Sequence, residues 1–167
     1  MKLRTAVRSD VPLLLELVRE LARYEREPDA VHATEEDLRR EGFGERPAFH
    51  AVIAEEGGAA VGFALFVFHF STWLGRRSLY LEDLFVRPEA RGRGVGKALL
   101  QHLAQRALDE GCGRFEWSVL DWNTDAIGFY ERLGARWLGE WTTMRVEGEG
   151  LRALATGTTP APPRLTK

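Results

Sequence analysis

The sequence has one cysteine and few histidines, which limits the metal and redox chemistry open to it. Cys112 alone cannot form an intramolecular disulfide or a cysteine-rich metal site. The four histidines, His32, His50, His69 and His102, are too widely spaced to suggest a shared metal ion. We therefore expect no metal site.

Long apolar runs and an excess of one charge are also missing. No run approaches the roughly 20 apolar residues that span a bilayer, and the N-terminus has no apolar signal region. We therefore expect a cytoplasmic protein without a membrane partner. The net charge of −2 shows no general basic character, which argues against nucleic acid as the main partner. The 167 residues, 44% hydrophobic and 29% charged, are typical of one globular domain with a real core.

The most informative stretch begins with a strand that carries two adjacent carboxylates. Ser78–Val86 (SLYLEDLFV) is rich in strand formers and ends before Pro88, which cannot donate to a sheet ladder. The run is apolar at both alternations, as expected of a strand buried on both faces. Glu82 and Asp83 are then anomalous, because burying an ionised carboxylate costs several kcal/mol unless it is paired. This pair is a candidate functional site.

A basic, glycine-rich loop follows the strand and precedes a segment with helical apolar spacing. Glycines before a helix let the backbone approach a ligand, and the first N–H groups of a helix have no internal partner. We expect this helix start to bind a phosphate or pyrophosphate. The loop consists of Arg91, Gly92, Arg93, Gly94, Val95, Gly96 and Lys97, of which the two arginines and the lysine add positive charge.

Two common phosphate-binding motifs do not fit this loop. The P-loop pattern fails because its first glycine is replaced by Arg91 and its Ser or Thr by Ala98. The dinucleotide fingerprint fails because Lys97 takes the place of its last glycine. The pattern that fits is R-x-x-G-x-G after a strand.

The remaining segments predict a mixed α/β protein without internal repeats. Alternating or continuous apolar runs predict strands at 2–7, 48–55, 59–70 and 114–120, with two short strands at Trp137 and 141–147. Capping residues and helical spacing predict helices at about 10–25, 34–42, 94–110 and 123–133. The helix between the strands at 78–86 and 114–120 predicts a parallel, right-handed crossover.

With this order in place, several strings resemble the spermidine/spermine N-acetyltransferase branch of the GNAT (Gcn5-related) N-acetyltransferases. The resemblance covers roughly Leu3 to Ala155 and rests on strings that occur in order along the chain. They are ELARYE at 20–25, EGFGERP at 41–47, YLEDLFV at 80–86, RGRGVG at 91–96, WN at 122–123 and FYERLGA at 129–135.

The resemblance implies the GNAT fold, an α/β architecture. This fold is a mixed, mostly antiparallel sheet of about seven strands with helices on both faces, splayed at the central strands. We expect one domain over residues 1–155 and a disordered tail over 156–167, which has too few apolar residues to pack. Members of this branch are homodimers, so the resemblance also implies contacts between subunits through the last strands and Leu151–Ala155.

The resemblance further implies acetyl-CoA as cosubstrate. Backbone groups of Phe85 and Val86 should pair with its pantetheine arm, and the N–H groups of 91–96 should bind its pyrophosphate. Asn123 resembles the family residue that touches the cofactor after the fifth strand. Tyr130 matches the tyrosine that protonates the departing thiolate.

The chemistry of acetyl transfer gives the carboxylates a role. An alkyl amine has a pKa near 10, so at neutral pH it must lose a proton before it attacks a thioester. Glu82 is the candidate base, directly or through a water molecule, while Asp83 and Glu25 would attract the cationic substrate. Strand alternation places Glu82 and Asp83 on opposite faces, so both serve one site only where the sheet splays.

Each of these residues also has a structural interpretation. Glu82 could be a carboxylate satisfied within the fold, Glu25 a solvated helix-end charge, and Tyr130 a core aromatic beside Phe129. Trp73 either packs against an alkyl amine chain or covers the core from its hairpin. Tyr24 is expected to line the same pocket as Glu25.

The sequence departs from the polyamine enzymes in the loop before the central strand. Ser71 replaces an acidic residue two positions before Trp73, and the loop 72–78 is one residue longer. This predicts a less acidic pocket and favours a shorter amine such as thialysine. The sequence thus predicts a GNAT enzyme that transfers acetyl to a primary amine of a small molecule (polyamine, diamine or thialysine-like amino acid) by direct attack. The alternatives are a protein lysine or N-terminal acetyltransferase and a CoA-binding module without turnover.

Overall fold

The computed structural model describes residues 1–158, and the chain divides into two units, Met1–Val119 and Leu120–Lys167. Each unit is described by itself. Of the expected tail over 156–167, the part from residue 159 onward lies outside the described residues.

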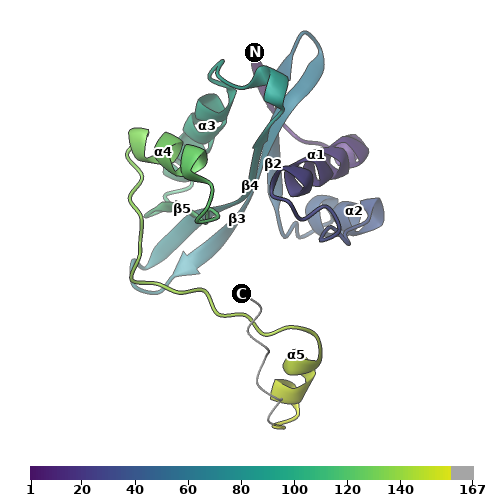
Figure 1. Cartoon of the computed structure of the whole chain (residues 1–167), viewed down its shortest axis with the longest axis vertical. Coiled ribbons are helices and arrows are strands. Elements are labelled where there is room, and N and C mark those ends of the chain that lie inside the picture. The colour runs from purple at the N-terminus through teal and green to yellow at the C-terminus, as the bar shows by residue number, and fades with distance from the viewer. Residues whose placement is uncertain (159–167) are drawn as a thin grey trace. The chain divides into compact units, whose positions relative to one another are not determined.

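The first unit contains a sheet of five strands in sequence order (Figure 1). Neighbouring strands are antiparallel except for β4 and β5, which are parallel, so the sheet is mixed and mostly antiparallel as expected. The strands are β1 Lys2–Thr5, β2 His50–Glu56, β3 Ala59–Ser71, β4 Arg76–Val86 and β5 Phe115–Trp117.

Helices cover both faces of this sheet, as predicted. The pleat sends alternate residues of β2 and β3 to opposite faces. Ile53 and Phe63 belong to a buried cluster with Leu14 and Leu17 of α1. α1 (Val11–Tyr24) and α2 (Glu35–Phe43) lie on this side, while α3 (Val95–Asp109) contacts β2, β3 and β4 from the other side (Figure 1). Two 3-10 turns, η1 (Arg8–Asp10) and η2 (Pro88–Ala90), precede α1 and the glycine-rich loop.

Local sequence signals explain where these elements begin and turn. The Thr34 hydroxyl accepts a hydrogen bond from the Asp37 N–H at 3.2 Å, and the Asp37 carboxylate accepts one from the Thr34 N–H at 2.9 Å. This capping box starts α2 as predicted. The β2–β3 hairpin turns at Gly57 and Gly58, both at positive φ.

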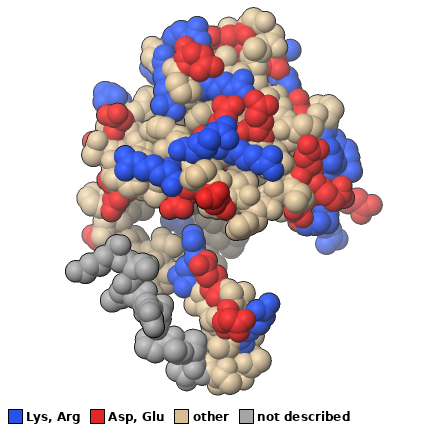
Figure 2. Space-filling view, turned by 45° about the vertical axis from the view of Figure 1, so that its right-hand side comes forward, with Lys and Arg blue, Asp and Glu red and all other residues tan. Residues whose placement is uncertain are grey.

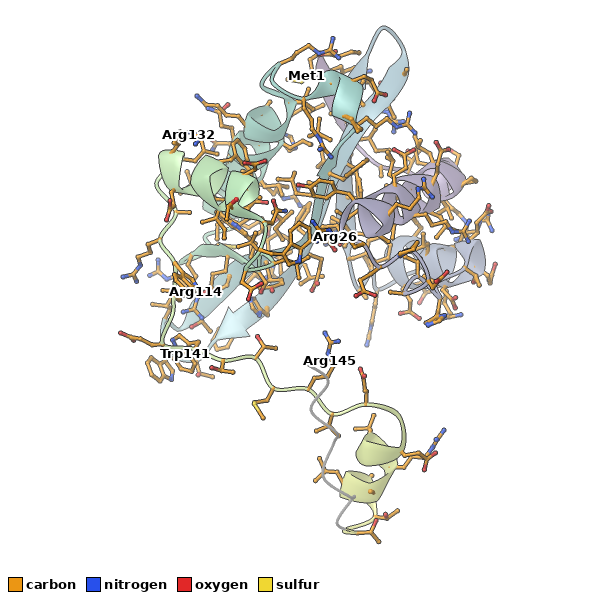
Figure 3. All side chains as sticks on the ribbon, viewed as in Figure 1. Met1, Arg26, Arg114, Arg132, Trp141 and Arg145 are labelled. Carbon is orange, nitrogen blue, oxygen red and sulfur yellow. The ribbon has the colours of Figure 1, made fainter. Side chains whose placement is uncertain are left out.

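The second unit differs from the prediction after its first helix. α4 (Thr124–Arg132) forms as expected, with the Asn123 side chain as its cap. The expected strands at Trp137 and 141–147 are absent from the described residues, and α5 (Gly148–Ala155) follows instead. The sheet therefore has five described strands, not about seven. Alternating residues at 141–147 resemble a strand locally, but a strand forms only where a partner satisfies its backbone groups. Trp141 is 72% exposed, and Figure 3 shows its side chain on this extended segment.

Two observations concern the surface of the described residues. No helix within residues 1–158 is long and apolar enough to cross a membrane. Basic and acidic side chains are interspersed over the face that Figure 2 shows.

Candidate active site

The central strand β4 loses its second neighbour halfway along its length. Its parallel ladder with β5 pairs only Leu79 to Leu81 with Phe115 to Trp117. Beyond Leu81, residues 82–86 have no partner strand on that side within the described part of the chain. This half of β4 therefore has a free edge, which is where the expected splay would lie.

A β-bulge on β4 lies at the predicted carboxylate pair. Leu65 of β3 pairs with Asp83, but the next residue, Phe66, pairs with Leu81, so Glu82 is left without a partner. A bulge interrupts the regular alternation of side chains. Alternation along an unbroken strand was the basis for placing Glu82 and Asp83 on opposite faces, so at this bulge it no longer fixes the face of Glu82.

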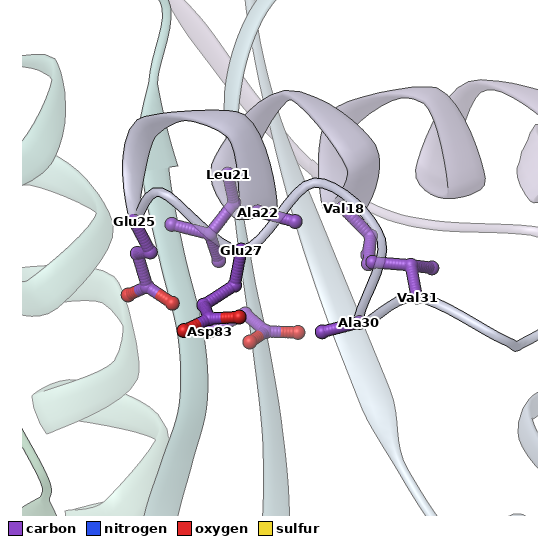
Figure 4. A pocket seen from close by; sticks show the side chains of 8 residues that line it. All are labelled: Val18, Leu21, Ala22, Glu25, Glu27, Ala30, Val31 and Asp83. Atoms are coloured by element: carbon purple, nitrogen blue, oxygen red, sulfur yellow. The ribbon is translucent and has the colours of Figure 1, made fainter. Parts of the chain in front are cut away.

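Asp83 faces α1 and lines a small cavity of about 170 Å³ (Figure 4). The wall is mostly apolar, and three carboxylates gather on one side of it below the last turn of α1. The lining residues are Val18, Leu21, Ala22, Glu25, Glu27, Ala30, Val31 and Asp83. An apolar wall with several carboxylates is suited to an alkyl chain that ends in a cationic amine.

Glu27 is a cavity residue that the sequence did not reveal. The end of α1 is a Schellman turn, in which the Glu27 N–H donates to Ala22 O at 2.9 Å and the Arg26 N–H donates to Arg23 O at 3.2 Å. Arg26 takes the left-handed position of this turn, with a φ of 67°. Figure 3 labels its side chain. Glycine usually marks such a turn, so arginine here gave no sequence signal for it.

The cavity carboxylates are not neutralised by a nearby cation. Among the described residues, Glu25, Glu27 and Asp83 have no ion pair. Burial raises the pKa of Asp83 from 3.8 to about 6, with smaller contributions from the negative charges of Glu82 and Glu25. Burial also raises the pKa of Glu25. A cationic ligand would favour the ionised form of both carboxylates.

The glycine-rich loop has the backbone shape expected of an anion site. Gly92 and Gly94 have φ values of 73° and 85°, and Gly94 is the N-cap of α3. An added Cβ at either glycine would meet nothing within 4 Å. The positive φ, and not a lack of space, therefore requires glycine at these two positions. The first N–H groups of α3 have no acceptor inside the helix. These features fit a pyrophosphate. The Arg91 N–H was expected to be one of its donors, but it already donates to Pro88 O at 3.2 Å.

The cationic side chains of the loop have different partners. Arg93 forms an ion pair with Glu56 of the β2–β3 hairpin at 2.9 Å. Arg91 donates from Nε to Val86 O at 2.9 Å. Lys97 is exposed and makes no ion pair with any described residue. Lys97 is thus the loop cation most available to an anion in this structure.

The register of β4 identifies the backbone groups at its free edge. The Phe85 carbonyl oxygen lies 2.5 Å from where a Cβ on Gly62 of β3 would be, so it points toward β3. Carbonyls alternate in direction along a strand, so those of Leu84 and Val86 point to the free edge. A ligand along this edge would pair with Leu84 and Val86, and not with the backbone of Phe85.

Two residues that the sequence predicts to bind substrate are exposed. Trp73 is 88% exposed in the β3–β4 hairpin and does not line the cavity, which removes the interpretation that it covers the core. Tyr24 ends α1 beside Glu25 and lies under the Arg91 guanidinium, whose Cζ is 4.5 Å from the ring centre. Tyr24 thus contacts the glycine-rich loop and is not among the residues that line the cavity.

Asn123 and Tyr130 belong to the second unit and are described within it. The buried Asn123 accepts a hydrogen bond from Ala126 N at 3.3 Å through its Oδ1 atom, which fixes the start of α4. Tyr130 is partly buried on α4, with its ring centre 5.3 Å from that of Phe129. The assignment of Tyr130 as an acid stays a prediction.

Known proteins match this chain over most of its length. Residues 14–135 match the acetyltransferase (GNAT) family. Thialysine N-epsilon-acetyltransferase from Sus scrofa is 45% identical over 164 residues, covering 92% of this chain and 96% of the relative. The human spermidine/spermine N(1)-acetyltransferase-like protein 1 is 36% identical over 164 residues, covering 92% of this chain and 24% of that longer protein.

A solved structure shares the fold. An integron cassette protein from the mobile metagenome of V. cholerae is 32% identical with a TM-score of 0.79, covering 92% of this chain and 96% of that one. The glycine-rich loop, the free edge of β4 and these matches have one explanation. The protein belongs to the GNAT family of acetyltransferases, in the branch that resembles the spermidine/spermine and thialysine enzymes.

Proposed function

We propose that this enzyme transfers the acetyl group of acetyl-CoA to a primary amine of a small molecule, a polyamine, a diamine or a thialysine-like amino acid. The carboxylate-lined cavity between the end of α1 and Asp83 carries this proposal. Its volume of about 170 Å³ suits the end of a slender alkyl amine. The names of the thialysine relatives support an amine at the end of a short side chain.

The free edge of β4 and the start of α3 would hold acetyl-CoA. Backbone groups of Leu84 and Val86 are suited to the amides of the pantetheine arm, and the N–H groups of 92–97 to the pyrophosphate. Asn123 is proposed as a further contact to the cofactor.

The reaction is proposed as a direct attack. Glu82, directly or through a water molecule, accepts a proton from the ammonium group of the substrate. The free amine attacks the thioester carbonyl and a C–N bond forms. The nitrogen of the tetrahedral adduct then loses its extra proton to the solvent, and the C–S bond breaks as the adduct collapses to the neutral amide. Tyr130 gives its proton to the departing thiolate and regains one from the solvent. No covalent enzyme intermediate is needed.

Carboxylates in the cavity would bind the substrate before transfer. Asp83 and Glu25 attract the cationic amine, as expected from the sequence, and Glu27 adds a third negative charge. The charge of Glu27 was not expected from the sequence, so a diamine or polyamine is favoured more than the sequence indicated. Trp73 is proposed to contact the far end of a longer amine.

A homodimer in the cytoplasm is the proposed working form. The exposed side chains of Trp137, Trp141 and Met144, each at least 72% exposed, support a contact with a second copy. Light scattering coupled to size-exclusion chromatography measures the mass, and a monomer at micromolar concentration would contradict the dimer.

The decisive experiment measures thiol release from acetyl-CoA against a panel of amines. The panel contains spermidine, 1,5-diaminopentane, thialysine, lysine, an aminoglycoside and a lysine-containing peptide. We expect turnover with at least one small diamine or thialysine and little with the peptide. Preference for the peptide would support the protein acetyltransferase. Tight CoA binding in calorimetry without turnover of any amine would support the CoA-binding module.

A further inference from the structure

One side chain of the glycine-rich loop contacts two other elements at once. Arg91 donates from Nε to the carbonyl of Val86 at the end of β4, at 2.9 Å. Its Cζ atom also lies 4.5 Å from the ring centre of Tyr24, the last residue of α1, and 5.8 Å from that of Phe85. The guanidinium therefore joins the loop, the end of β4 and the end of α1.

The position of this guanidinium coincides with the free edge of β4. The Val86 carbonyl points to this edge, where no described strand pairs with it. A ligand that adds to a sheet edge uses such carbonyls as hydrogen-bond acceptors. The pantetheine arm of CoA contains two secondary amides, each with one N–H donor. Arg91 thus bonds the acceptor that a pantetheine amide would use.

We propose that the side chain of Arg91 is an internal competitor for the pantetheine arm and so regulates access to the cofactor site. This inference rests on the proposed function, because it requires CoA to bind along β4. In this structure the guanidinium contacts Val86 O and the Tyr24 ring. Binding of the pantetheine arm displaces it from the carbonyl and from the stack.

The displaced guanidinium has a second partner within the same ligand. Arg91 is the first residue of the glycine-rich loop, whose later N–H groups suit a pyrophosphate, and arginine pairs strongly with phosphate oxygens. Arg93 forms an ion pair with Glu56, so Arg91 and Lys97 are the loop cations that remain to bind the pyrophosphate. Arg91 therefore opposes one half of CoA, the pantetheine arm, and attracts the other half, the pyrophosphate.

The first test changes the ring under the guanidinium and leaves the loop intact. Tyr24→Leu removes the aromatic face, and Tyr24→Phe retains it as the matched control. We expect Tyr24→Leu to bind CoA about two- to fivefold more tightly in isothermal titration calorimetry, the range of an exposed cation–π contact. Tyr24→Phe should keep the wild-type affinity. Unchanged or weaker CoA binding by a folded Tyr24→Leu protein would overturn the proposal.

The second test separates the two halves of the ligand. Arg91→Met retains an unbranched side chain but cannot donate to Val86 O or pair with phosphate. We expect it to bind pantetheine, which has no pyrophosphate, more tightly than wild type in an NMR titration, and to bind CoA more weakly. Opposite signs for the two ligands are specific to an internal competitor. Weaker binding of both ligands would show that Arg91 is only a phosphate ligand or a structural contact.

These outcomes are distinct from a failure of the proposed function. If wild-type protein does not bind CoA at all, the proposed function fails. If it binds CoA and acetylates amines while Tyr24→Leu and Arg91→Met show none of the expected changes, only the inference about Arg91 fails.

Discussion

Asp83 of β4 and Glu25 at the end of α1 line the same small cavity, and neither carboxylate has an ion pair among the described residues. Each has a pKa raised by burial, which is a cost to the folded protein when the group is ionised. A cationic amine between them would relieve this cost. We therefore expect changes at these two carboxylates to alter the stability of the protein, its pH dependence and the binding of an amine.

Asp83→Asn should stabilise the protein at neutral pH. The folded pKa of about 6 is above the value of 3.8 for a free carboxyl, so the folded state binds the proton more tightly. The Asp83 contribution to stability is then greatest below about pH 4 and is lost as the pH rises to about 6. We expect the free energy of unfolding to rise by about 1–3 kcal/mol at pH 7 and to change little at pH 3.5. Thermal unfolding at the two pH values measures this difference as a shift in Tm. An equal gain at both pH values would show that the change acts through packing.

The same substitution should weaken the binding of the amine. The variant lacks a carboxylate in the cavity, so the KM for a diamine should rise at pH 7. In the wild-type enzyme this KM should rise as the pH falls below about 6, where Asp83 takes up a proton. A KM that does not change between pH 7 and pH 5 would contradict a role for Asp83 in binding the cation.

Glu27→Gln should change the choice of amine more than the rate. A carboxylate at an exposed edge of the cavity would attract the second charge of 1,5-diaminopentane, an effect of about two- to fivefold. We expect kcat/KM for this diamine to fall by that factor, with little change for pentylamine, which has one charge. Glu36→Gln on α2 removes the same charge outside the cavity and is the control. Equal losses for both amines would remove Glu27 from substrate selection.

Glu82→Gln should lower activity most at neutral pH. If Glu82 accepts the proton of the ammonium group, kcat/KM should fall by about 10²-fold or more and recover partly as rising pH supplies free amine. Stopped assays between pH 7 and pH 10 measure this profile, with Glu89→Gln on the nearby turn as control. A profile identical to that of the wild type would exclude Glu82 from proton transfer.

Tyr130→Phe should reduce kcat by about 10²-fold or more, because it removes the proton donor to the thiolate. The phenyl ring preserves the packing beside Phe129, so Tm should not change. Tyr80→Phe on β4 is a matched loss of a hydroxyl, here one that bonds the Ser118 hydroxyl at 2.8 Å. An unchanged kcat would return Tyr130 to a purely structural role.

Local chemistry made much of the first unit predictable. Proline after β4, the capping box at Thr34 and the glycines at 57 and 58 act over a few residues, so the sequence indicated these boundaries correctly. The strands expected at Trp137 and 141–147 could not be judged in this way. Their alternation is local, but pairing depends on a partner that is distant in the sequence.

The sequence by itself determined the family, the glycine-rich loop and the two carboxylates of β4, because these depend on residue type and short spacing. Tertiary structure decided which groups meet. A bulge at Glu82 changes the alternation, the left-handed turn at Arg26 adds Glu27 to the cavity, and the Arg91 guanidinium bonds the free edge of β4. The bulge and the guanidinium contact depend on backbone register and on contacts between segments distant in the sequence, which give no local signal. The turn at Arg26 is local, but it lacks the glycine that usually marks such a turn.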